Sequence, residues 1–304
     1  MKNILIVLLG PTGVGKTDLS IDLAGHFRCD IISADSRQFY REMNIGTAVP
    51  SPEQLSSVRH HFIGFISVKD YYSASLYERD VLRLLPSLFS KNPLALMTGG
   101  SGLYIDAVCR GIDDIPDTSQ SVRNKYVQKY RDEGIEGLRI MLKIVDPVYY
   151  EKVDLKNPQR IIRALEICES TGRPYSTFLT RKEQPRDFEI IRVGINRSRE
   201  ELFGRINRRV DDMIAAGLVD EARKLYPLRD LNALNSVGYG ELFEYFASRI
   251  SREKAIELIK RNSRRYAKRQ LTWWNRDKDI AWFRADEKDR IIEYLSNKID
   301  RLSS

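Results

Sequence analysis

The stretch Ile4-Leu-Ile-Val-Leu-Leu-Gly-Pro-Thr-Gly-Val-Gly-Lys-Thr17 decides the fold of this chain. Its apolar part, Ile4 to Leu9, predicts a buried strand, and Gly10–Thr17 matches the P-loop pattern G-x-x-x-x-G-K-[ST]. Glycines let the backbone turn tightly, so its N–H groups converge on a phosphate chain at the start of the next helix. The stretch therefore predicts an α/β protein with a polyphosphate site.

Within this P-loop, two side chains carry specific chemistry. Lys16 would bring a point charge to the phosphates, and the hydroxyl of Thr17 would be a ligand for Mg²⁺. The alternative is a glycine-rich turn with an incidental lysine. The predicted phosphate-binding residues are Gly10, Pro11, Thr12, Gly13, Val14, Gly15, Lys16 and Thr17.

Composition narrows the class of protein without naming a function. The 304 residues are 42% hydrophobic and 30% charged, which is ordinary for a globular protein with a substantial core. Apolar runs are too short to cross a membrane, and the three cysteines form no C-x-x-C pair. We therefore expect a cytoplasmic protein without a membrane anchor, zinc module or disulfide framework. The net charge of +8 makes an anionic partner plausible.

Apolar runs and helical periodicity alternate along the first part of the chain, which predicts a P-loop NTPase-like core with a parallel sheet flanked by helices. Expected strands are 4–9, 29–34, 61–66, 93–97, 189–195 and 280–283. Expected helices outside the middle region begin near 17, 75, 103, 199, 218, 239 and 252, and a terminal helix runs to about 302. From 119 to about 181 only helical patterns occur, at 121–131, 137–144, 147–153 and 158–170. We therefore predict a core of 1–112 and 188–304 and an all-helical insertion of 113–187.

A carboxylate follows the second predicted strand. Asp35 should face the same crevice as the P-loop, because ligands of open α/β sheets bind beyond the carboxyl ends of the strands. The strand that ends at Met97 is followed by Thr98-Gly-Gly instead of the acid that usually holds Mg²⁺ in P-loop ATPases. Asp35 could replace that acid, act as a general base, or be a turn aspartate.

Cations gather on one face of the predicted helix 252–271. Arg261, Arg264, Arg265, Lys268 and Arg269 have helical spacing, and aromatic residues lie among and after them. Such a stripe repels itself unless an anion covers it, so it favours a nucleic-acid backbone over a solvated face.

Two further sets of arginines point to anions. Arg160 and Arg163 stand near the start of the helix capped by Asn157, where either an anion or solvent could meet them. Arg209 lies on an otherwise apolar stripe of its helix. A guanidinium buried there needs a partner, which is either a ligand diphosphate or an internal salt bridge.

Taken together, these motifs resemble the tRNA dimethylallyltransferase family, also called tRNA isopentenyltransferases. The matching stretches run in order along the chain: Gly10–Thr17, Ile31–Ser36, Tyr40–Ala48, Gly99–Tyr104, Asn157–Ala164, Val237–Tyr239 and Tyr266–Trp273. The resemblance implies transfer of a dimethylallyl group from dimethylallyl diphosphate to N6 of the adenosine 3′ of the tRNA anticodon. It also implies that the target base leaves its stack to enter a channel through the core.

The resemblance implies a role for individual residues. Asp35 would be the general base, Ser101 would bond near the reacting centre, and Lys16 and Arg209 would hold the diphosphate with Mg²⁺ at Thr17. The positions that match the family's tRNA contacts, in the anticodon stem-loop, are Asp35, Ser36, Arg37, Gln38, Ser101, Arg123, Gln159, Arg160, Ile161, Ile162, Arg163, Asn235, Ser236, Val237, Gly238, Tyr239, Gly240, Lys268, Arg269, Gln270 and Trp273. We expect a monomer.

The chain departs from the family pattern at three positions. Ser101 stands where most members have threonine, Gly240 replaces a basic residue, and Asn275 stands where arginine is common. No zinc-finger pattern follows, which favours the bacterial type. Two other functions remain open: a P-loop kinase or ATPase with Asp35 as base for a hydroxyl acceptor, and a noncatalytic RNA-binding protein with a nucleotide-sensing P-loop.

Overall fold

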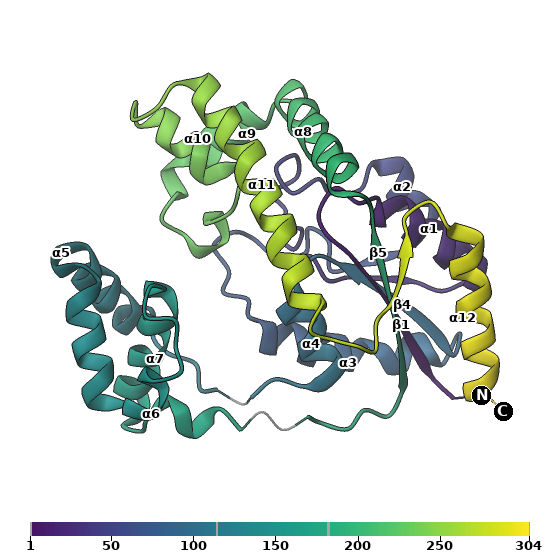
Figure 1. Ribbon diagram of the computed structural model, residues 1–304, viewed down its shortest axis with the longest axis horizontal. Coiled ribbons are helices and arrows are strands. Elements are labelled where there is room, and N and C mark those ends of the chain that lie inside the picture. The colour runs from purple at the N-terminus through teal and green to yellow at the C-terminus, as the bar shows by residue number, and fades with distance from the viewer. Residues whose placement is uncertain (1, 114, 181–182, 304) are drawn as a thin grey trace. The chain divides into compact units, whose positions relative to one another are not determined.

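The computed structural model describes residues 2–113, 115–180 and 183–303, and the chain divides into two compact units (Figure 1). The larger unit comprises Met1–Arg110 and Pro185–Ser304, and the smaller one is Gly111–Gln184. The smaller unit thus begins at residue 111 rather than 113 and ends at 184 rather than 187.

A six-stranded parallel sheet forms the centre of the larger unit, in the order β3-β2-β4-β1-β5-β6. The strands are β1 (Ile4–Leu9), β2 (Ile31–Ser33), β3 (His60–His61), β4 (Leu94–Gly99), β5 (Glu189–Asn196) and β6 (Ala281–Arg284). Strand β1 pairs with β4 on one side and β5 on the other, and every residue of it is buried. Burial on both faces explains its uninterrupted apolar sequence. The predicted α/β class with a parallel sheet is confirmed.

Alternate residues of β1 belong to two separate hydrophobic cores, one on each face of the sheet. Ile4, Ile6 and Leu8 pack in one core, while Leu5 and Leu9 pack in the other. The first core is covered by α1 (Lys16–Phe27) and α12 (Lys288–Ser303), which lie beside one another in Figure 1. The second is covered by α3 (Ala74–Phe89) and α4 (Gly102–Arg110). The two covered faces are those that a doubly wound sheet requires.

The helices after β5 complete the larger unit and surround the carboxyl end of the sheet. They are α8 (Arg199–Ala215), α9 (Leu218–Leu225), α10 (Tyr239–Phe246) and α11 (Arg252–Trp274), with 3₁₀ turns at Tyr226–Leu228 and Asn232–Leu234. Helix α11 packs against α8, α10 and α4. A short helix, α2 (Pro52–Ser57), precedes β3.

The smaller unit is helical and has a core of its own. It contains α5 (Gln120–Val145), α6 (Pro147–Tyr150), α7 (Pro158–Thr171) and a 3₁₀ turn at Tyr175–Phe178. Leu138, Leu142, Ile161 and Leu165 fill the space between α5 and α7. The Asn157 side chain accepts from the backbone N–H of Arg160 and so caps α7, as the sequence predicted.

One prediction of local structure was confirmed and one was inexact. The two helices expected at 121–131 and 137–144 are present within α5, where a non-helical Gly134 (φ 72°) forms a kink between them. The strand expected at 61–66 is reduced to His60–His61, because Phe62 (φ 64°) and Gly64 (φ 58°) leave the extended region. Ile66 then makes only an isolated bridge to Tyr40.

In the described part of the chain, no helix combines the length and apolar composition needed to span a bilayer. Cys29, Cys109 and Cys168 are buried free thiols.

Candidate active site

The P-loop connects β1 to α1 in the conformation that its glycines permit. Gly13 (φ 79°) and Gly15 (φ 110°) occupy the left-handed region, and α1 begins at Lys16. The Lys16 ammonium donates to the carbonyl oxygens of Gly10 (2.7 Å) and Pro11 (3.0 Å). Burial lowers the pKa of Lys16 to about 8, although the nearby Asp35 carboxylate opposes the shift. The ammonium therefore lies inside the P-loop, where the oxygens of a bound phosphate could replace the two carbonyl oxygens as its acceptors.

Arginines from α8 and the residues before it brace the P-loop. Arg209 donates to the Thr12 hydroxyl (3.1 Å), Arg205 to the Gly13 carbonyl (2.9 Å), and Arg197 to the carbonyl of residue 14 (2.8 Å). Burial lowers the pKa of Arg209, and Asp35 acts against this. Among the described residues Arg209 has no carboxylate at salt-bridge distance, so the internal salt bridge considered above is not observed. Arg197 and Arg205 were not among the predicted site residues; the helical spacing of Arg205 and Arg209 is a signal that could have indicated Arg205.

The P-loop opens into a polar cavity of about 800 Å³, here called the P-loop pocket. Its walls combine the P-loop and the start of α1 with the ends of β2 and β4 and one side of α8. Its charged lining residues are Lys16, Asp18, Asp35, Arg205, Arg208, Arg209 and Asp212. The hydroxyl residues Thr12, Thr17, Ser20, Ser33 and Thr98 also line it. The pocket therefore has the cations and hydroxyls that a diphosphate requires.

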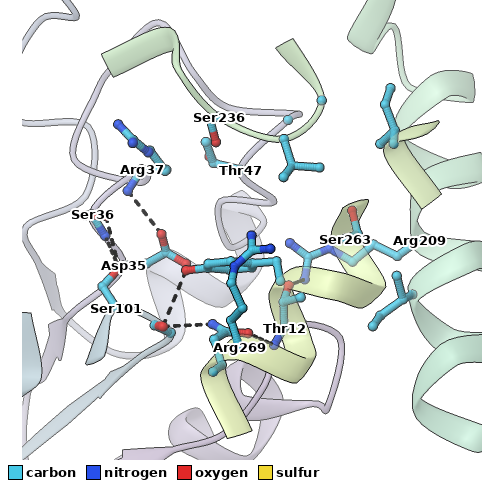
Figure 2. Close-up of a pocket in the computed structure, with 18 of the residues that line it drawn as sticks. Thr12, Asp35, Ser36, Arg37, Thr47, Ser101, Arg209, Ser236, Ser263 and Arg269 are labelled. Carbon is cyan, nitrogen blue, oxygen red and sulfur yellow. Dashed lines mark hydrogen bonds between the residues drawn. The ribbon is translucent and has the colours of Figure 1, made fainter. Parts of the chain in front are cut away.

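A second cavity, of about 450 Å³, lies against α11 and is here called the α11 pocket (Figure 2). Apolar side chains of α8, α9 and α11 line part of it, and Ser36, Arg37, Ser101, Asn235, Ser236 and Arg269 supply polar groups. Figure 2 shows Asp35 beside Ser101 and Arg209 directed toward Thr12. Five residues line both cavities: Thr12, Asp35, Gly100, Arg209 and Gln270. The two pockets thus meet at Asp35.

Asp35 follows β2 and has two roles in the geometry. Its Oδ1 accepts from the backbone N–H of Arg37 (3.1 Å), which is the turn aspartate considered as an alternative above. Its Oδ2 has no hydrogen-bond partner in the described part of the chain, and it lies near Gly100 at the junction of the pockets. One oxygen therefore holds the turn while the other remains available to a ligand.

Ser101 joins the loop after β4 to the loop after β2. Its hydroxyl accepts from the backbone N–H of Ser36 (2.9 Å) and donates to the Ser36 hydroxyl (3.0 Å). Tyr266 of α11 lies next to it, and burial together with Asp35 raises the Tyr266 pKa to about 12. Beside the P-loop, the Thr98 hydroxyl stands at the end of β4 where ATPases have an acid; it is buried and has no hydrogen-bond partner among the described residues.

The cations of α11 are arranged in two groups. Arg264 and Lys268 lie over the ring of Phe203, while Arg269 lies over Tyr266 and lines the α11 pocket. Arg261, Arg265, Lys268 and Arg269 are exposed. Trp273 lines the same pocket, and its indole N–H donates to Asp106 (2.8 Å). The predicted cationic face is therefore present on the surface of α11.

Three side chains at predicted tRNA-contacting positions form hydrogen bonds within the larger unit. Gln270 is buried and bonds Thr12 and Gly100. Gln38 donates to the carbonyls of Thr47 and Ala48. Tyr239 is fully buried and donates to Glu221, whose carboxylate also accepts the backbone N–H groups of residues 44–46. The amide of Gln270 and the hydroxyl of Tyr239 hold loops of the protein in place, and contact of these two positions with tRNA stays a prediction.

The segment 235–240 approaches Arg37, whose guanidinium donates to the carbonyls of Asn232, Ala233 and Asn235. Asn235 and Gly240 are exposed, whereas Gly238 is buried and begins α10. Asn235, Ser236 and Val237 line the α11 pocket together with Arg37. These predicted positions are thus brought beside Asp35 by the tertiary fold.

In the helical unit, the predicted cations surround a buried acid. Glu166 is fully buried; Arg123 donates to one of its oxygens (3.0 Å), and Arg163 approaches the other (3.5 Å). Arg123 also donates to Gln159. Gln159 and Arg160 are exposed. The side chains of Ile161 and Ile162 lie in the core of the unit, and contact of these positions with tRNA stays a prediction.

Comparison with known proteins agrees with this geometry. The model of the IPP transferase family matches residues 38–277. A "tRNA dimethylallyltransferase 1" of Phocaeicola vulgatus is 52% identical over 97% of this chain and 98% of its own length. A "tRNA dimethylallyltransferase" of Christiangramia forsetii is 50% identical over 99% of this chain and its whole length. The solved tRNA isopentenylpyrophosphate transferase of Bacillus halodurans is similar over 99% of this chain and 98% of that one, with 35% identity and a TM-score of 0.72.

Proposed function

The chain belongs to the IPP transferase family, and we propose that it is a tRNA dimethylallyltransferase. The transferred group would come from dimethylallyl diphosphate, and the acceptor would be N6 of the adenosine 3′ of the tRNA anticodon. Relatives that are named for this activity align with nearly the whole chain, at 50% identity and above.

One observation carries the assignment of roles: the P-loop pocket and the α11 pocket meet at Asp35 and Arg209. The P-loop pocket has the chemistry of a diphosphate site, and the α11 pocket has apolar, aromatic and polar walls suited to a base. A prenyl donor bound by its diphosphate would present its reacting carbon at the junction. A flipped adenine in the α11 pocket would present N6 to the same place.

The residues of the junction fit the bond changes of prenyl transfer. N6 forms a bond to C1 of the dimethylallyl group while the bond between C1 and the diphosphate oxygen breaks. Asp35 accepts the proton that N6 loses, and Oδ2 is the oxygen that can do so. Lys16, Arg209 and the P-loop N–H groups stabilise the negative charge of the departing diphosphate. Ser101 keeps the Asp35–Ser36 turn in place from the β4 side.

Mg²⁺ is part of the proposal. The Thr17 hydroxyl is a hard oxygen ligand that lines the P-loop pocket. Within the described residues there is no cluster of three acidic, histidine or cysteine side chains, so the ion would be held by few protein ligands together with phosphate and water oxygens. When bound, it neutralises diphosphate charge.

For tRNA recognition we assign contacts with the phosphate backbone to cations of α11 and of the helical unit. Lys268 and Arg269 supply positive charge beside the α11 pocket. In the helical unit the exposed Arg160 and the half-buried Arg123 and Arg163 supply it. We further propose that the protein acts in the cytoplasm as a monomer, since one chain builds both pockets.

The test is incorporation of label from radiolabelled dimethylallyl diphosphate into unmodified tRNA in the presence of Mg²⁺. A matched control tRNA carries guanosine in place of the target adenosine and therefore lacks the N6 amino group. We expect label in the first tRNA only, and none from the Asp35→Asn variant above background. Consumption of ATP without labelling of tRNA would support the kinase or ATPase instead, and tRNA binding without any turnover would support the noncatalytic reading.

A further inference from the structure

Gln270 is a buried amide at the place where the two pockets meet. It lies near the C-terminal end of α11, is 5% exposed, and lines both the P-loop pocket and the α11 pocket. Its Oε1 accepts from the backbone N–H of Thr12 (2.8 Å), and its Nε2 donates to the backbone carbonyl of Gly100 (2.8 Å). One side chain therefore connects the P-loop to the loop after β4.

Each end of this connection holds a different part of the proposed reaction. On the P-loop side, the Thr12 hydroxyl accepts from Arg209, so the position of Thr12 also places the Arg209 guanidinium. On the other side, Gly100 precedes Ser101, which holds the Ser36 turn next to Asp35. Gln270 thus fixes the distance between the groups that would bind the diphosphate and Asp35, the proposed base.

The amide also prevents the two loops from relaxing independently. The Thr12 N–H and the Gly100 carbonyl would both be left with a buried unmade hydrogen bond if the amide were removed, which backbone groups avoid. A Cβ on Gly100 would lie 2.5 Å from Nε2 of Gln270, so the loop and the amide are already in close contact. The amide is therefore packed as well as hydrogen-bonded.

We propose that Gln270 is a positioning residue. It holds the P-loop, where the diphosphate would bind, at the distance from Asp35 that the transfer requires. It touches neither reacting atom, and it acts on the transfer step through Thr12–Arg209 on one side and Gly100–Ser101 on the other. This inference rests on the proposed function. Small misplacements of reacting groups slow a transfer strongly while leaving binding of the separate substrates almost unchanged.

The first experiment replaces Gln270 by residues of similar length. Gln270→Met removes both hydrogen bonds, and Gln270→Glu keeps the acceptor for Thr12 but puts a carboxylate oxygen against the Gly100 carbonyl. We expect Gln270→Met to slow single-turnover transfer by about 10- to 100-fold, with the Kd values for tRNA and for the prenyl diphosphate changed less than about threefold. Gln128→Met, an exposed glutamine on α5, is the matched control and should transfer at the wild-type rate.

The second experiment moves the amide without replacing it. Gly100→Ala places its methyl group against Nε2, and Gly100 is not in the left-handed region, so the backbone itself tolerates alanine. We expect this variant to slow transfer as well. In the double variant Gly100→Ala/Gln270→Ala, the methyl group has room, so transfer should be no slower than in Gln270→Ala alone.

The outcomes separate the two proposals. A wild-type protein that transfers no prenyl group overturns the proposed function. If the wild type is active and Gln270→Met transfers the prenyl group at the same single-turnover rate, the inference is overturned. A lower melting temperature of the variant would not change this conclusion. Loss of tRNA or donor affinity in parallel with the rate, or multiplicative effects in the double variant, would also overturn it, because Gln270 would then act in binding or independently of Gly100.

Discussion

The P-loop pocket and the helical unit both gather cations for an anionic ligand, but they hold them differently. Around the P-loop, Lys16, Arg205 and Arg209 are placed by bonds to the loop itself, mostly to backbone carbonyls. In the helical unit, Arg123 and Arg163 are placed by the side chain of Glu166, which is buried between α5 and α7. A backbone cradle depends on the conformation of one short segment, whereas a side-chain cluster depends on the packing of two helices.

The difference teaches where each region should be vulnerable. Changes near the P-loop should alter chemistry or donor binding and leave tRNA affinity intact. Changes in the helical unit should alter tRNA affinity or the stability of that unit and leave the chemistry intact, because the unit has a hydrophobic core of its own.

Asp35→Asn should have the largest effect. The amide oxygen can still accept from the Arg37 N–H, so the turn is retained, but the group cannot take a proton. Transfer should fall about 10²- to 10⁴-fold, measured as single-turnover labelling of tRNA, with the Kd for tRNA unchanged. A variant with full turnover would remove Asp35 as the base.

Lys16 should determine how donor use depends on pH. Its pKa is about 8 in the free protein because of burial, so the ammonium is present below this pH and is lost as the pH rises through it. We expect kcat/KM for the prenyl diphosphate to fall above about pH 8. Lys16→Arg should move this fall to higher pH, since guanidinium stays charged. Lys16→Met should lower donor affinity by about 10-fold or more. An unaltered pH profile in Lys16→Arg would contradict the assignment.

Glu166→Leu tests the helical unit. Removal of the buried carboxylate leaves Arg123 and Arg163 without their shared partner, and the expected cost to the unit is about 1–3 kcal/mol, because both arginines are partly solvated. Hydrogen exchange should accelerate in residues 120–171 and stay unchanged in β1 and β4. Weaker tRNA binding with unchanged donor binding is expected; loss of protection in the sheet would show that the two units do not unfold separately.

Ile144→Ser should have the smallest effect. This side chain is 75% exposed on α5, in contrast to the buried Leu142 two residues before it. The expected change in the free energy of unfolding is within about 0.5 kcal/mol, checked by chemical denaturation. Leu142→Ala is the buried counterpart, and it should cost about 2–5 kcal/mol. Equal effects of the two changes would mean that the exposed face of α5 is packed in solution.

Local sequence patterns were sufficient to predict the features that depend on the backbone or on residues of a single element. The turn of the P-loop requires glycines, and these are visible in the sequence. Strand β1 is buried on both faces, so its sequence is uninterruptedly apolar. Asn157 caps α7 through a contact with a residue only three positions away. The strand expected at 61–66 is shorter because Phe62 and Gly64 have positive φ values; there the Phe62 ring contacts Tyr77 and the Gly64 N–H donates to the Gln38 carbonyl, contacts that the local pattern does not encode.

Residue types were less informative about which side chains remain free for a ligand. Gln270 and Tyr239 stand in motif positions that match tRNA contacts, yet their polar groups are used by Thr12, Gly100 and Glu221. A motif indicates that a position belongs to the site. It does not indicate whether the side chain faces the ligand or the loop that holds the ligand.

The α/β class, the phosphate-binding loop at Gly10–Thr17 and the cationic face of α11 could be predicted from sequence, because each is encoded within about thirty residues by glycine, periodicity or charge. The folded chain was needed to see that Asp35 stands between two pockets, that Arg205 and Arg209 brace the P-loop, and that Gln270 joins it to Gly100. These contacts connect residues as far apart as 258 positions, and such pairs form only when the sheet and α11 come together.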